Sequence, residues 1–117
     1  MKTTFAGRKF QFWEYRVSHG ELLVRSPKGA GSSFNVDLMF VGVEYVDLPR
    51  FLPELEVDEP TEDDLLRAKE RLGKAVEKRS TTVLKCQGRR HVVVATAVSV
   101  SENDMDIFDS PFKDQSG

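Results

Sequence analysis

Residues 33–48 read SFNVDLMFVGVEYVDL and decide the fold, because they form the longest run of strand-forming residues in the chain. Their apolar side chains occupy both parities of the run: Phe34, Val36, Leu38, Phe40, Val46 and Leu48 on even positions, and Met39, Val41, Val43 and Tyr45 on odd ones. A strand that is apolar on both faces is covered on both faces. The run therefore predicts the central strand of a sheet, with a bulge or a bend at Gly42.

A predicted hairpin, residues 9–26, precedes this strand and carries four aromatic side chains in its first arm. In a regular strand Phe10 and Phe12 share one face, whereas Trp13 and Tyr15 share the other. Either a bulge between Phe12 and Trp13 brings the aromatics to one side, or both faces of the strand are covered. We expect Trp13 and Tyr15 to form the second group and to be covered at least in part by another protein molecule.

A single helix is predicted to begin at Thr61, whose hydroxyl is placed to cap the first turn, with Asp64 at the position of the reciprocal capping-box partner. Apolar residues follow at helical spacing: Leu65, Ala68, Leu72, Ala75 and Val76. The helix ends at Gly73 or continues frayed beyond it. The proline-rich residues 49–60 predict an irregular crossing segment, with room for a short edge strand near 55–57.

Two further strands are predicted at residues 80–86 and 90–101. One face of the second strand is bulky and carries Val92, Val94, Val98 and Val100. The other face has small residues at its centre and reads His91, Val93, Ala95, Ala97 and Ser99. Because small residues let a helix approach a sheet closely, we expect the helix to pack on this second face.

These elements predict an α+β fold: a mainly antiparallel sheet of about five strands with one amphipathic helix, in the order β-β-β-α-β-β. The helix is long enough to link two parallel strands, so parallel pairing of the central strand with residues 80–86 stays open. Residues 1–101 are interpreted as a single domain and residues 102–117 as an acidic C-terminal tail.

Composition favours a protein of the reducing cytoplasm. The chain has 117 residues, a formal net charge of −2 and one cysteine, Cys86, which excludes an intrachain disulfide. We find no apolar signal segment at the N-terminus and no stretch long enough to span a membrane. Residues 67–90 are strongly basic, but the aromatics lie elsewhere in the chain, so nucleic acid is not the expected partner.

The sequence offers few groups for chemistry, and we expect no cofactor and no metal site. Asp37 and Asp47 are interpreted as solvated residues at strand ends, whereas Glu44, near the middle of the strand, is the best candidate for a carboxylate in a cleft. Together with His91 or His19, it gives a weak candidate ligand-binding set.

The function expected from these features is a small, cytoplasmic, non-enzymatic protein that binds another protein or a second copy of itself, in the manner of a small inhibitor or immunity protein. Large aromatics and arginine are typical of interface centres. The expected interface residues are Phe10, Phe12, Trp13, Tyr15, Arg89 and Arg90. The alternative is a small-ligand-binding domain or small enzyme with a cleft between sheet and helix that uses Glu44 and a histidine.

Overall fold

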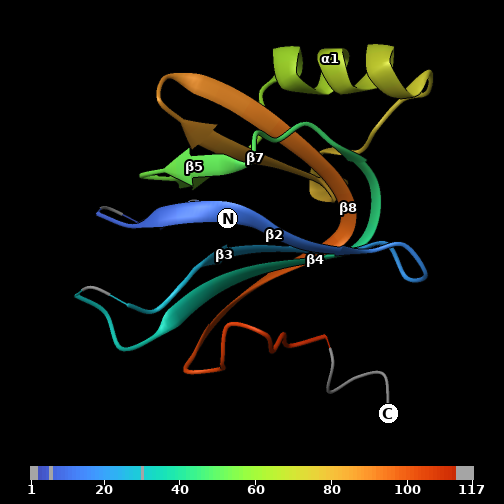
Figure 1. The fold of residues 1–117 in the computed structure, drawn as a ribbon. Coiled ribbons are helices and arrows are strands. Elements are labelled where there is room, and N and C mark those ends of the chain that lie inside the picture. Colours follow the sequence, from blue (N-terminus) through green and yellow to red (C-terminus); the bar gives the residue numbers. More distant parts are fainter. Residues whose placement is uncertain (1–2, 6, 30, 113–117) are drawn as a thin grey trace.

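The computed structural model describes residues 3–5, 7–29 and 31–112 (Figure 1). Its elements follow in chain order: β1 (Thr3–Thr4), β2 (Lys9–Arg16), β3 (Glu21–Ser26), β4 (Asn35–Val46), β5 (Phe51–Pro53), β6 (Glu56–Asp58), α1 (Glu62–Leu72), the 3₁₀ turn η1 (Lys78–Ser80), β7 (Thr81–Cys86) and β8 (Arg89–Asn103). Among these residues, no helix is both long and apolar enough to cross a membrane.

The prediction of about five strands is wrong, because the described residues form one sheet of eight strands in the order β1-β6-β7-β8-β4-β3-β2-β5. The three additional strands, β1, β5 and β6, are two or three residues long. Segments of this length carry no readable hydrophobic periodicity. The sheet-dominated α+β class is confirmed. Every ladder between described strands is antiparallel, so the alternative of a parallel pairing between the central strand and residues 80–86 is wrong.

The sheet curls round and closes on a core. β5 stands at one end of the strand order and β6 next to the other end, yet only Glu54 and Leu55 separate them in the chain. So short a connection cannot cross an open sheet whose neighbouring strands are ~4.8 Å apart, so the two ends of the sheet must meet. The enclosed core contains Phe10, Leu22, Val24, Val36, Leu38, Phe40, Leu52, Leu55, Val57, Leu84, Cys86, Val93 and Ala95.

Gly42 marks the bend of the central strand, as its position in the sequence predicted. Its φ is +68°, and a Cβ built on it would lie 2.5 Å from Thr96 Oγ1 on the neighbouring β8. Around this point β4 presents Phe40 and then Val43 to the core, so the inward-facing parity changes. Figure 1 shows β4 and β8 curving together around this end of the molecule, and a second irregularity lies between Val43 and Tyr45.

Helix α1 begins and ends where the sequence places it, but it packs on the other face of β8. Thr61 and Asp64 form the capping box, and Gly73 ends the helix with a φ of +76°. The helix contacts the bulky face, which carries Val92 and Val94, and not the small-residue face that we expected. The small residue at this contact is supplied by the helix: Ala68 packs with Val83, Val92 and Val94. The face with Val93 and Ala95 lines the core instead.

Strand β2, which carries the four aromatics, contains a bulge, one of the two alternatives that the sequence left open. Its pairing with β3 shifts between Phe12 and Glu14, so Trp13 has no partner in the ladder. Beyond the bulge Tyr15 stands opposite Leu22, whose side chain lies in the core. Tyr15 therefore falls on the inner side of the sheet with Phe12, and it does not form one group with Trp13.

Candidate functional site

The segment after β8, residues 104–112, lies across the outer face of β2, β3 and β4. Side chains of the sheet donate hydrogen bonds to its main-chain carbonyl groups: Arg16 to Phe112 (2.8 Å), Arg25 to Asp109 (2.9 Å), Asn35 to Met105 (3.0 Å) and Lys28 to Asp104. Ser110 and Phe112 are buried against the sheet. The segment is thus held at both ends, although it has no regular secondary structure.

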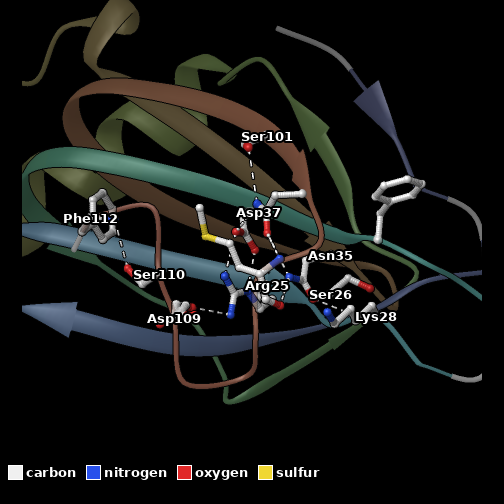
Figure 2. Close-up of polar contacts among 12 residues, drawn as sticks. Arg25, Ser26, Lys28, Asn35, Asp37, Ser101, Asp109, Ser110 and Phe112 are labelled. Atoms are coloured by element: carbon white, nitrogen blue, oxygen red, sulfur yellow. Dashed lines mark hydrogen bonds and ion pairs between the residues drawn. The ribbon is translucent and has the colours of Figure 1, made fainter. Parts of the chain in front are cut away.

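A buried ion pair between Arg25 and Asp37 lies beneath this segment (Figure 2). Arg25 Nε and Nη2 donate to the two carboxylate oxygens of Asp37 at 2.7 and 3.0 Å, and neither side chain has exposed surface. Asn103 Nδ2 donates to the same carboxylate at 2.8 Å. Because a buried charge is costly unless it is paired and hydrogen-bonded, this satisfied geometry is what keeps both ions inside the protein.

The ion pair follows from the register of the central strands. Arg25 of β3 and Asp37 of β4 are direct cross-strand partners, so their side chains leave the sheet on the same face. Asp37 was expected to be solvated at a strand end, and that interpretation is wrong. The signal available in the sequence was one base and one acid on two consecutive predicted strands, but pairing them requires the register of the strands, which the sequence does not state.

Trp13 lies beside this ion pair, at the bulge in β2. The guanidinium carbon of Arg25 lies 5.4 Å from the centroid of the Trp13 ring, within the range of a cation–π contact. Successive side chains of a strand alternate between its faces, so Trp13, next to the inward-facing Phe12, points to the outer face, and the bulge then turns Tyr15 back toward the inner face. Trp13, one of the four aromatics expected at an interface, thus lies beside Arg25, a residue that the sequence analysis did not select.

A cavity of about 250 Å³ opens between Trp13 and the C-terminal segment. Its lining residues are Trp13, Arg25, Pro27, Lys28, Asn35, Met105, Asp106 and Ile107. The walls are mostly apolar and the floor is polar. Ile107 is 58% exposed at the rim, and its neighbour Phe108 is 80% exposed. The volume lies below the range of ~300–1,000 Å³ typical of small-molecule sites, and it suits a single inserted side chain.

Arg90, expected at an interface, is instead a structural residue of the helix N-terminus. Its Nη2 donates to Asp64 at 2.7 Å and its Nη1 to Asp58 at 3.1 Å. Burial alone would raise the pKa of Asp64, but the hydrogen bonds from Arg90 and Thr61 outweigh it and hold that pKa well below its usual value. The hydrogen bonds that Arg90 donates, above all to Asp64 and also to Asp58, raise the pKa of Arg90. Its neighbour Arg89 stays exposed at the β7–β8 turn.

The ligand set proposed around Glu44 is not assembled in any cavity described here. Glu44 is half exposed and forms an ion pair with Lys74 at 2.5 Å. His19 lies exposed in the turn between β2 and β3, and His91 pairs with Leu84 in the β7–β8 hairpin. A groove between α1 and the sheet exists, but it is lined by other residues: Tyr45, Asp47, Arg67, Ala68, Glu70, Arg71, Arg90 and Val92.

Two of the four aromatics predicted at an interface belong to the core. Phe10 has no exposed surface, and Phe12 packs against the core cluster. The assignment of Phe10 as a contact residue is therefore corrected, because a partner has no access to it. The assignment of Phe12, which is partly buried, stays a prediction. Tyr15 is 40% exposed, and Trp13 lines the cavity.

Across the described ranges, no group of three or more histidine, cysteine, aspartate or glutamate side chains is arranged to hold a metal ion. No protein-family model, curated protein or solved structure matches this chain.

Proposed function

We propose that this protein is a non-enzymatic binding protein that accepts one apolar side chain of a protein partner in the cavity beside Trp13. The observation that carries the proposal is the combination of an aromatic wall with the exposed Ile107 at its rim. Tryptophan and arginine in a desolvated pocket are typical of the residues that dominate binding energy in interfaces. As part of the proposal the protein acts in the cytoplasm, since its single cysteine forms no intrachain disulfide.

The site is organised for binding before a partner arrives. The Arg25–Asp37 pair fixes the floor, and hydrogen bonds to carbonyl groups of the C-terminal segment fix the far wall. A pocket that is already ordered loses little conformational entropy on binding, which favours affinity for a given contact area.

The test uses affinity capture from extracts of the native cell, followed by titration of each purified candidate partner. Trp13 is the only tryptophan of the chain, so its fluorescence reports occupancy of the cavity. The readout applies to partners that lack tryptophan, or where Trp13 can be excited selectively. Ile107→Ser should weaken binding at least tenfold, because it removes an apolar wall without touching the ion pair.

Leu66→Ser is the matched control, since Leu66 is a comparably exposed apolar residue (53%) on α1. It should bind as the wild type does. A partner that binds Ile107→Ser and the wild type with equal affinity, and leaves Trp13 fluorescence unchanged, contradicts the proposal.

A further inference from the structure

The second half of β8 is an unprotected sheet edge, separate from the Trp13 cavity. β7 pairs with residues 89–94 of this strand and β4 with residues 93–103. Within the described part of the chain, residues 95–103 therefore have a strand partner on one side only. The exposure agrees with the pairing: Thr96, Ala97, Ser99 and Val100 are all exposed, whereas every residue of the interior strand β3 is buried.

The other free edges of the described sheet carry devices that discourage pairing with a second chain. β5 has three residues and contains Pro53. The free part of β2 is interrupted by the bulge at Trp13 and carries Glu14 and Arg16. Natural sheets protect their edges by short strands, prolines, bulges and charges. Residues 95–101 of β8 have none of these: they read ATAVSVS, with no charge and no proline.

The direction of the free hydrogen-bonding groups follows from one main-chain hydrogen bond. The carbonyl of Val92 accepts from Asp47 N at 3.0 Å, so it points toward the β4 side of the strand. In an antiparallel ladder, main-chain groups of successive residues point alternately to the two sides. The extra residue of the irregularity between Val43 and Tyr45 lies in β4, so the alternation along β8 is kept, and Ala97, Ser99 and Ser101 direct their N–H and C=O groups to the open side.

We infer that this edge pairs with the same edge of a second copy of the chain, as two antiparallel strands related by a two-fold axis at Ser99. In this register Ser99 lies opposite Ser99 of the copy, and Val98 lies opposite its Val100. Glu102 lies opposite Thr96, so no acid faces another acid. The pairing satisfies the open main-chain groups and covers Val100, which is 40% exposed in the monomer.

The second copy is favoured over a strand from another protein because the sequence of the edge is complementary to itself. It is uncharged, it is rich in β-branched residues and small hydroxyl residues, and its one flanking acid is kept away from the axis. Isologous contact of one surface with itself is also the commonest route to a closed dimer.

The mass in solution of the full chain tests this inference. We expect a dimer for the wild type and a monomer for Ser99→Lys and for Ser99→Glu, because each variant places two like charges together at the axis. An equimolar mixture of the two variants should restore a dimer, now heterotypic, because opposite charges meet. Leu66→Lys, on the exposed face of α1, is the control and should remain dimeric.

A wild type that remains monomeric at every soluble concentration overturns the inference. So does a dimer that Ser99→Lys leaves intact, or a mixture that stays monomeric. Hydrogen exchange of the wild type gives a second measurement that needs no variant. The amides of Ala97, Ser99 and Ser101 should exchange more slowly as the protein concentration rises, and exchange independent of concentration contradicts the two-fold pairing.

Discussion

Arg25 and Asp37 face each other across β3 and β4 and form a two-point ion pair with no exposed surface on either side chain. Trp13 lies against the guanidinium, and Arg25 Nη1 also donates a hydrogen bond to the carbonyl of Asp109. One cross-strand pair therefore connects the bulge of β2, the middle of the sheet and the C-terminal segment.

Removal of one member of the pair should be strongly destabilising. Asp37→Ala leaves the Arg25 charge buried without its partner, and we expect the free energy of unfolding to fall by about 3–5 kcal/mol. Urea denaturation followed by circular dichroism measures the change. The double variant Arg25→Met with Asp37→Leu should recover most of the loss, because apolar side chains of similar volume carry no buried charge. A double variant as unstable as Asp37→Ala would show that the loss has another origin.

The C-terminal segment should contribute to the stability of the sheet through Phe112. This side chain is 1% exposed, so Phe112→Ala should lower the free energy of unfolding by about 3 kcal/mol. Phe108, four residues earlier and 80% exposed, provides the control, and Phe108→Ala should change stability by less than about 0.5 kcal/mol. Equal effects of the two substitutions on the denaturation midpoint would contradict docking of the segment. The division into residues 1–101 and a separable tail stays a prediction until this is measured.

Gly42 should tolerate substitution less well than Gly73. Both have positive φ, and the left-handed conformation costs an alanine about 1–2 kcal/mol at either position. Only at Gly42 would the new Cβ also meet Thr96, so Gly42→Ala should lose more stability than Gly73→Ala in thermal or urea unfolding. Adding Thr96→Ser to Gly42→Ala keeps the hydroxyl, so it should restore little. Adding Thr96→Gly removes the contact, so Gly42→Ala in that background should lose no more stability than Gly73→Ala does. The comparison is made with Thr96→Gly alone, because a glycine in a strand has its own cost in stability.

Stability should depend on the ionisation of Asp64. Its pKa in the folded protein lies well below its usual value of 3.8, because the hydrogen bonds from Arg90 and Thr61 outweigh the effect of burial. A carboxylate with a lowered folded pKa stabilises the protein fully above its unfolded pKa, and the stabilisation is lost as pH falls through the folded pKa. The difference in stability between the wild type and Asp64→Asn should be constant from about pH 7 to pH 5 and shrink below about pH 4. A difference that persists unchanged to pH 2 would show that the ionised form is not what stabilises this helix end.

Local features of the fold were predictable because each depends on residues a few positions apart. Thr61, Asp64 and Gly73 give the start and end of α1 through hydrogen bonds and backbone conformation within one helical turn. The bend at Gly42 and the break near Trp13 were readable as interruptions of strand periodicity. The short strand β5 was missed, and β6 was foreseen only as a possible edge strand near residues 55–57, because the pairing of such three-residue segments comes from closure of the sheet.

The sequence by itself determined the sheet-rich class and the helix with its caps, since propensity, capping and side-chain period act over short distances. Tertiary structure alone decided the register that sets Arg25 against Asp37, and the path that brings Ile107 to Trp13. Both depend on contacts between residues far apart in the chain, whose energies are small individually and are selected together when the sheet closes. For that reason Asp37 is buried and Glu44 is half exposed, the reverse of what their sequence positions indicated.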